Sequence, residues 1–190
     1  MKEVDDNYYD LAIVDPPYGI SKNMKGTRKM GRDMKGKTWN DDIPPKEYFI
    51  ELFRVSKNQI IWGANYYSDY LPPSRNWIVW DKKQPENIGF SMHEIAYTSF
   101  NTTPKIYRVY PDQKERRHHP CQKPVKLYEW TLLNYAKKGD KILDTHLGSG
   151  TIAYACYNLG YDLDGIELDK EYYLDAKKRI ERHTSQGRLF

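Results

Sequence analysis

The sequence predicts an α/β domain with a mostly parallel, twisted sheet and helices on both faces. Three observations lead to this prediction. Short apolar segments typical of strands alternate along the chain with longer segments of helical spacing. Two strand candidates, Gln59–Trp62 and Trp77–Trp80, are nearly continuous apolar runs, as expected where helices cover both faces of a sheet. Two other strands end in turns that carry a carboxylate, at Asp15 and at Asp144.

Each element follows from its local pattern. Leu11–Val14 is a short apolar run closed by an Asp-Pro-Pro turn, which predicts a buried strand with a rigid end. Pro44 and Pro45 precede a helix over Lys46–Ser56, whose large apolar residues recur at helical spacing. Further strands are expected at Gln59–Trp62, Trp77–Trp80, Glu94–Ser99, Lys105–Tyr110, Lys141–Asp144 and Asp162–Glu167. Further helices are expected from Pro124 to about Lys137, over Thr151–Asn158 and over Lys170–His183.

The overall composition narrows the class of protein. A chain of 190 residues fits one domain over 1–190 with a single core. Its apolar runs fall short of the roughly 20 residues that span a bilayer, and the charged start Met1–Asp6 lacks a secretory signal. We therefore expect a cytoplasmic protein with no membrane partner. The two cysteines, Cys121 and Cys156, lack metal-ligand spacing, so neither a disulfide framework nor a metal site is expected.

Positive charge is concentrated in the segment 19–42, which has no sustained period and is predicted to be a basic mobile loop. The net charge of +4 is compatible with a polyanionic partner. Between Ser21 and Lys37 the chain carries seven basic residues against the single acid Asp33: Lys22, Lys25, Arg28, Lys29, Arg32, Lys35 and Lys37. A second basic group contains Lys114, Arg116, Arg117, His118 and His119. A solvated charged surface is the alternative interpretation of both groups.

The turn after Asp144 has the features of a site for a nucleoside cofactor. Gly148 and Gly150 allow a close backbone approach at the start of a helix, and Glu167 at the end of the next strand can accept both ribose hydroxyls. The glycines do not match G-x-G-x-x-G, and Asp144 would repel a pyrophosphate. An acid there suits S-adenosylmethionine, which has an ammonium, a sulfonium and a ribose but no phosphate. A turn that only packs the strand against the helix could contain the same glycines.

The turn Asp15-Pro16-Pro17-Tyr18 has the features of a site for an exocyclic amine. Proline lacks a backbone donor, so the carbonyl groups here are expected to face outward as unpaired acceptors. Asp15 could accept one N–H of the amine and the Pro16 carbonyl the other, while Tyr18 offers a face for stacking the base. The amine would then attack an electrophilic methyl group in line. The alternative is a strand that ends in a proline turn with a solvent-facing Asp.

Three segments together resemble one enzyme family. Asp15–Tyr18 resembles the D-P-P-Y catalytic motif of amino-group DNA methyltransferases, and Asp144–Gly150 resembles their F-x-G-x-G cofactor motif. His119–Pro124 resembles their H-P-(T/C)-Q-K-P segment, which lines the methionine end of the cofactor site. The catalytic motif precedes the cofactor motif, an order that resembles the beta group of the family. His146 stands where the family usually has Phe.

The resemblance implies a Rossmann-like S-adenosylmethionine-dependent methyltransferase fold, S-adenosylmethionine as the donor, and methylation of the N6 amine of a flipped adenine in DNA. Cytosine N4 is the alternative target, although such enzymes more often have Ser at the position of Asp15. Methylation of an amine in RNA or protein, and a non-catalytic relative that binds cofactor or DNA, also stay open. The resemblance further implies that the chain forms a homodimer.

The residues expected at the site fall into three groups. The catalytic group is Asp15, Pro16, Pro17 and Tyr18. The cofactor-binding group is Asp144, His146, Gly148, Ser149, Gly150, Thr151 and Glu167, with Gln122 and Lys123 added by the resemblance. The DNA-binding group is Lys22, Lys25, Arg28, Lys29, Arg32, Trp39, Arg116 and Arg117, and 100–118 is expected to be a DNA-contacting insertion. All of these roles require that the turns at Asp15 and Gly148 lie side by side.

Overall fold

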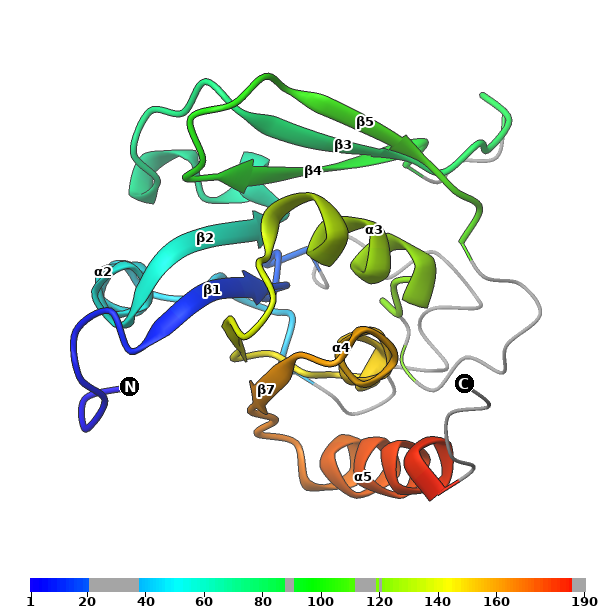
Figure 1. Ribbon diagram of the computed structural model, residues 1–190. Coiled ribbons are helices and arrows are strands. Elements are labelled where there is room, and N and C mark those ends of the chain that lie inside the picture. The colour runs from blue at the N-terminus through cyan, green and yellow to red at the C-terminus, as the bar shows by residue number, and fades with distance from the viewer. Residues whose placement is uncertain (21–37, 88–90, 112–118, 120, 186–190) are drawn as a thin grey trace.

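The computed structural model describes residues 1–20, 38–87, 91–111, 119 and 121–185. Within these residues the strands form one seven-stranded sheet of order β5-β3-β4-β2-β1-β6-β7 (Figure 1). The strands are β1 (Tyr9–Val14), β2 (Ser56–Trp62), β3 (Trp77–Asp81), β4 (His93–Thr98), β5 (Lys105–Arg108), β6 (Lys141–Asp144) and β7 (Asp162–Gly165). The helices are α2 (Lys46–Val55), α3 (Val125–Tyr135), α4 (Thr151–Leu159) and α5 (Lys170–Ser185). Short 3-10 turns occur at Ala64–Tyr66 and Ser68–Tyr70.

The sheet is mostly parallel, as predicted. Strands β2, β1, β6 and β7 pair in parallel, and so do β3 and β5. Strand β4 runs antiparallel to both of its neighbours, β2 and β3. The connection from Asp81 to His93 is short and contains no described helix that could carry the chain back across the sheet. A direct return of this kind makes neighbouring strands antiparallel.

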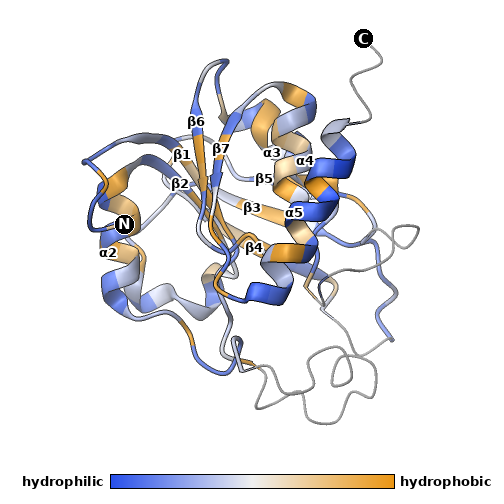
Figure 2. Ribbon diagram, turned by 90° about the horizontal axis from the view of Figure 1, so that it is seen from below, coloured by the Kyte–Doolittle hydropathy of each residue, from blue (hydrophilic) through white to orange (hydrophobic). Residues whose placement is uncertain are grey.

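Helices cover both faces of the sheet. Because side chains alternate along each strand, a central strand such as β1 contributes to the core on each face. Leu11 and Ile13 of β1 belong to the core beneath α3 and α4. Ala12 and Val14 of the same strand belong to the core beneath α2. Figure 2 shows α2 on one side of the strands and α3 and α4 on the other. The fully apolar sequence of the central strands therefore reflects burial on two faces.

Most elements lie where the sequence predicts them, and the largest shift is at β2. This strand begins at Ser56, directly after α2, and not at Gln59. The hydroxyl of Ser56 donates to the carbonyl of Leu52, and the side-chain amide of Gln59 donates to the carbonyl of Ser56. Polar side chains therefore satisfy the helix end here, and they conceal the beginning of the strand from a search for apolar runs.

The segment 100–118 contains part of the sheet. Lys105–Arg108 is the edge strand β5, paired with β3, and residues 112–118 lie outside the described residues. Within the described part of this segment Lys105–Arg108 belongs to the sheet, and the expectation that 100–118 is a DNA-contacting insertion stays a prediction. In the part of the chain that the structure describes, no helix is long and apolar enough to cross a membrane.

The two turns singled out in the sequence lie side by side. Strands β1 and β6 pair in parallel, with Leu11 opposite Ile142 and Ala12 opposite Leu143. The carboxyl ends of parallel neighbours meet at one edge, so Asp15, directly after β1, and Asp144, the last residue of β6, lie at the same edge of the sheet. The chain passes from β1 to β2 on one side and returns to β6 on the other. Such a reversal of strand order is where open α/β sheets form their ligand sites.

The alternation of α2 between core and surface gives a test of the fold. Leu52 is completely buried, whereas Ile50 of the same helix is 56% exposed. We expect Leu52→Ala to lower the free energy of unfolding by about 2–5 kcal/mol because it leaves a cavity in the core. Ile50→Ala should cost less than about 1 kcal/mol. Urea denaturation of both variants measures the difference, and equal losses would contradict the packing of α2.

Candidate active site

A cavity opens at the carboxyl edge of the sheet, where β1 and β6 end. Its walls come from the turns after β1, β6 and β7, from the segment before α3 and from the start of α5. The lining residues are Asp15, Pro16, Pro17, Tyr18, Trp39, Asn40, His119, Cys121, Lys123, Tyr128, Thr145, His146, Leu147, Gly148, Ser149, Glu167, Leu168, Asp169 and Tyr172.

All the residues expected to be catalytic line this cavity, together with part of the expected cofactor group. The members of the cofactor group on the wall are His146, Gly148, Ser149, Glu167 and Lys123. Asp144, Gly150, Thr151 and Gln122 are not among the described residues that line it. The structure therefore divides the sequence motif into residues that face the cavity and residues that shape the turn behind it.

Glu167 is fixed at the mouth of the Gly148 turn. Its Oε2 accepts the backbone N–H of Gly148 at 2.8 Å, and its Oε1 accepts that of Asp169 at 2.8 Å. A carboxylate oxygen can accept more than one hydrogen bond. Glu167 therefore joins the turns after β6 and β7 and retains acceptor capacity toward a ligand in the cavity.

Asp144 shapes the turn and is not part of the cavity wall. It is 2% exposed, and its Oδ1 accepts the backbone N–H of His146 at 2.9 Å. Burial raises the pKa of this carboxyl to about 7, against the lowering effect of that hydrogen bond. The carboxylate of Asp144 therefore caps the turn, and its expected contact with a ligand ammonium stays a prediction.

Gly150 is required for helix packing. Its φ is +73°, and an added Cβ would lie 3.2 Å from Ala176 and 3.1 Å from Ile180 of α5. The close approach is thus to a helix and not to the cavity. Thr151 is similarly turned inward, with its hydroxyl 2.6 Å from that of Ser149.

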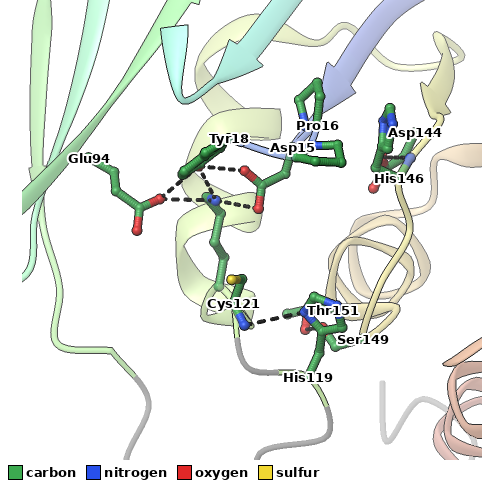
Figure 3. A network of polar contacts seen from close by, with 12 residues as sticks. Asp15, Pro16, Tyr18, Glu94, His119, Cys121, Asp144, His146, Ser149 and Thr151 are labelled. Atoms are coloured by element: carbon green, nitrogen blue, oxygen red, sulfur yellow. Dashed lines mark hydrogen bonds and ion pairs between the residues drawn. The ribbon is translucent and has the colours of Figure 1, made fainter. Parts of the chain in front are cut away.

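A buried cluster of charges surrounds Asp15 (Figure 3). The Nζ of Lys123 lies 2.5 Å from Asp15 Oδ2 and 3.0 Å from Glu94 Oε2. The hydroxyl of Tyr18 donates to Asp15 Oδ1 at 2.6 Å and lies 3.2 Å from Glu94 Oε2. Glu94 Oε1 also pairs with Lys82 at 2.6 Å. The cluster thus balances two carboxylates against two ammonium groups.

The two carboxyl groups of this cluster differ in their surroundings. Burial raises the pKa of Asp15, and Lys123 opposes that effect. Burial acts in the same direction on Glu94, but the ammonium groups of Lys123 and Lys82 outweigh it and hold the pKa at about 2. Burial works to lower the pKa of Lys123, and the two carboxylates raise it nonetheless. Lys123 is expected at the methionine end of a cofactor, and in the structure it contacts Asp15 directly.

The carbonyl groups of the proline turn have a partner. The hydroxyl of Tyr67 lies 2.6 Å from the carbonyl oxygen of Pro16 and 2.7 Å from that of Pro17. The expectation that these oxygens are unpaired was therefore wrong. A hydroxyl carries only one proton, so it donates to one of the two carbonyls at a time. The other carbonyl keeps a free lone pair.

Tyr18 is held in place from several sides. Its backbone N–H donates to Asn40 Oδ1 at 2.7 Å, and its ring stacks on Tyr66 with centroids 4.9 Å apart. One face of the Tyr18 ring is therefore covered by protein, in addition to the hydroxyl contact with Asp15. Sequence reasoning missed Asn40, Tyr66, Tyr67 and Glu94 because each is a single residue in a segment without a motif.

His146 is the residue that departs from the family pattern. Its Nδ1 lies 3.0 Å from the hydroxyl of Thr145 and 3.5 Å from that of Tyr48, and its ring meets the Tyr48 ring edge-on. Burial lowers the pKa of His146 to about 4, so the imidazole is neutral at pH 7. It presents a neutral, flat ring to the cavity, as a Phe would.

The expected DNA-binding residues are mostly outside the described part of the chain. Lys22, Lys25, Arg28, Lys29 and Arg32 fall in 21–37, and Arg116 and Arg117 fall in 112–118. Trp39 is described, and it lines the cavity with its ring 4.9 Å from that of His119. Burial, with Lys123 as the second cause, lowers the pKa of His119 to about 4. The rings of Trp39 and His119 therefore form an uncharged aromatic wall of the cavity that Asp15 and Glu167 also line.

The mostly parallel sheet, the reversal of strand order at β1 and the cavity between two strand-end turns define an open α/β domain with a ligand site at the carboxyl edge of its sheet. A family model for DNA methylases of the N6/N4 type matches residues 55–178. The chain therefore belongs to this family, and the family resemblance noted in its motifs is confirmed.

Curated relatives agree with this assignment. Type II methyltransferase M.HpaI from Haemophilus parainfluenzae is 27% identical over 95% of this chain and 71% of its own length. Type II methyltransferase M2.DpnII from Streptococcus pneumoniae is 32% identical over 76% of this chain and 49% of its own length. The chain thus spans about half the length of the second relative.

Solved structures share the fold. The M1.HpyAVI–SAM complex has a TM-score of 0.63 at 23% identity, covering 94% of this chain and 90% of that one. The cytosine-N4-specific PvuII DNA methyltransferase has a TM-score of 0.65 at 10% identity, covering 97% and 86%. The predicted Rossmann-like methyltransferase fold is therefore confirmed.

The packing of Tyr18 gives a test of the site. Gly63 has a φ of +71°, and an added Cβ would lie 2.2 Å from the Tyr18 ring. Gly139 also has a positive φ, of +90°, with nothing within 4 Å of an added Cβ. We expect Gly139→Ala to cost about 1–2 kcal/mol of unfolding free energy from backbone strain alone. Gly63→Ala should cost about 1–3 kcal/mol more because Tyr18 must move. Equal losses in urea denaturation would show that Gly63 does not support Tyr18.

Proposed function

We propose that this chain transfers the methyl group of S-adenosylmethionine to the exocyclic N6 amine of an adenine in DNA. The observation that supports this most strongly is the position of Asp15 and Glu167 on one cavity, at the ends of strands on either side of β6. One wall then offers acceptors for an amine, and the other offers acceptors for a ribose.

The charges of the cavity suit this donor. Among the described lining residues the acids are Asp15, Glu167 and Asp169, and the one lysine, Lys123, is already paired with two carboxylates. Such a wall attracts an ammonium and a sulfonium and disfavours a pyrophosphate. Glu167 would hold the ribose hydroxyls, and the neutral ring of His146 would stack on the donor. When bound, the donor supplies an electrophilic methyl group.

The reacting amine would be positioned by the turn after β1. Asp15 accepts one N–H of the amine, and the Pro16 carbonyl accepts the other while the Tyr67 hydroxyl donates to Pro17. With both N–H bonds held, the nitrogen lone pair leaves conjugation with the ring and points at the methyl group. Positioning and charge complementarity then account for the rate, and a strong base is not needed. The ring of Trp39 could stack on the base after it leaves the duplex.

Adenine is favoured over cytosine because an Asp precedes Pro16-Pro17-Tyr18, where enzymes acting on cytosine N4 more often have Ser. Both bases carry the exocyclic amine beside a ring nitrogen, so the same turn could hold either. DNA contacts are proposed for the basic residues of 19–42 and for Arg116 and Arg117. A second copy of the chain could help to hold the duplex.

Methyl transfer can be measured directly. We expect purified protein with methyl-labelled S-adenosylmethionine and mixed duplex DNA to yield labelled N6-methyladenine. Asp15→Ala should lower the rate by at least about 100-fold because the amine loses its acceptor. Asp10→Ala, at the opposite end of β1 in an exposed pair with Lys57, is the matched control and should stay active. Labelled N4-methylcytosine would replace the adenine assignment. Absence of label in DNA, RNA and protein would favour a non-catalytic binding protein.

A further inference from the structure

The Lys123 ammonium lies at the centre of the charge cluster, and the described groups that it pairs with are other members of that cluster. Its side chain is 2% exposed, and its contacts are Asp15 Oδ2, Glu94 Oε2 and the Tyr18 hydroxyl, at 2.5, 3.0 and 3.2 Å. A buried ammonium is stable only when opposite charges and hydrogen bonds surround it. Lys123 is therefore committed to these partners, and the geometry links it to Asp15 more closely than to the part of the cavity beside Glu167.

We infer that Lys123 is a positioning residue for Asp15: it keeps Asp15 a carboxylate inside the buried wall, and Glu94 competes with Asp15 for the same ammonium. This inference rests on the proposed function, in which Asp15 must accept an N–H of the amine. A neutral carboxyl would present a proton to the amine and would accept more weakly. The ion pair uses one lone pair of Oδ2 and the Tyr18 hydroxyl uses one of Oδ1, so each oxygen keeps capacity for the substrate.

The charges that face Asp15 show why it needs this lysine. Its own turn contributes Tyr18, and the neighbouring elements contribute Glu94 from β4, Lys123 and Cys121 from the segment before α3, Tyr128 from α3, Tyr67 from the turn after β2 and Asp144 from β6. Burial raises the pKa of the tyrosines, and it raises that of Cys121 to about 12, so these groups are neutral near pH 7. Lys123 is thus the single cation among them.

Asp15 is also the weaker acid of the pair. Among the described residues Glu94 is in contact with two ammonium groups, those of Lys82 and Lys123, whereas Asp15 contacts one, that of Lys123. If Lys123 were removed, two carboxylates would share the Tyr18 hydroxyl in a buried space, and one would take up a proton. Lys82 would keep Glu94 ionised, so the proton would go to Asp15. Removal of the Glu94 charge would instead leave Asp15 alone with Lys123 and strengthen its ionised form.

Carboxyl-carbon NMR of protein labelled at aspartate tests this inference without requiring activity. The Asp15 signal is assigned by its loss in Asp15→Ala. We expect Lys123→Met to move the Asp15 titration upward by at least about one pH unit and Glu94→Gln to move it downward. Lys123→Arg, which retains the charge, should stay near the wild type. Lys57→Met is the matched control, because this lysine forms an exposed pair with Asp10. Its Asp15 signal should not move.

Two further measurements separate the outcomes. Single-turnover methylation across about pH 5 to pH 9 should show a loss of rate at acidic pH that follows the Asp15 titration. This acidic limb should move to higher pH in Lys123→Met and to lower pH in Glu94→Gln. Calorimetry should give a donor Kd within about 3-fold of wild type in both variants.

An unmoved Asp15 titration in both variants would overturn the inference. So would an unmoved titration with a donor Kd more than about 10-fold higher, because Lys123 would then bind the donor. If Lys123→Met fails to fold, the direction in which the Asp15 titration moves in Glu94→Gln decides the inference alone. A wild-type chain that methylates nothing would overturn the proposed function, and the NMR result would still decide the network.

Discussion

The parallel pairing of β1 with β6 is the constraint on which the site depends. It brings residues more than a hundred positions apart in the chain to one edge of the sheet, with Leu11 opposite Ile142 and Ala12 opposite Leu143. The proline turn and the Gly148 turn then face the same cavity. Apolar packing on both faces fixes this register, because a shift by one residue would exchange the side chains between the two cores. Core packing thus sets the position of Asp15 relative to Glu167. Contacts between the cavity residues themselves are not needed for it.

Burial of charge is the second organising feature. Asp15, Glu94, Lys123 and Lys82 form a neutral, hydrogen-bonded group beside an aromatic wall. Each of these charges would be costly to bury alone, and together they specify one arrangement. The hydroxyl of Tyr18 joins this group, and the hydroxyl of Tyr67 bonds to the backbone carbonyls of the proline turn beside it. In this way the sheet, the segment before α3 and the turn after β2 all determine how Asp15 is presented to a ligand.

Much of the fold could be predicted from the sequence, because strands buried on both faces are apolar runs and helices have a clear period. The reversed direction of β4 could not, since antiparallel pairing leaves no mark on a run such as Glu94–Ser99. For the site, the motif turns predicted two parts of the cavity wall, Asp15–Tyr18 and Glu167. Glu94, Tyr67 and Asn40 were missed, because single polar residues acquire their role only through contacts across the sheet. The sequence did not reveal that Asp144 also caps the turn or that Gly150 packs on α5, and their predicted cofactor contacts stay predictions.

The most direct measurement is a crystal structure of the chain with a non-reactive amine analogue of S-adenosylmethionine. The account predicts that the ribose hydroxyls bond to Glu167 and that the methyl-donating end faces Asp15. The space between the analogue and Asp15 should admit an amine whose nitrogen lies about 3–3.5 Å from the methyl position and is hydrogen-bonded to Asp15. An analogue bound in the opposite direction, or one separated from Asp15 by packed side chains, would contradict the assignment of this cavity as a methyl-transfer site.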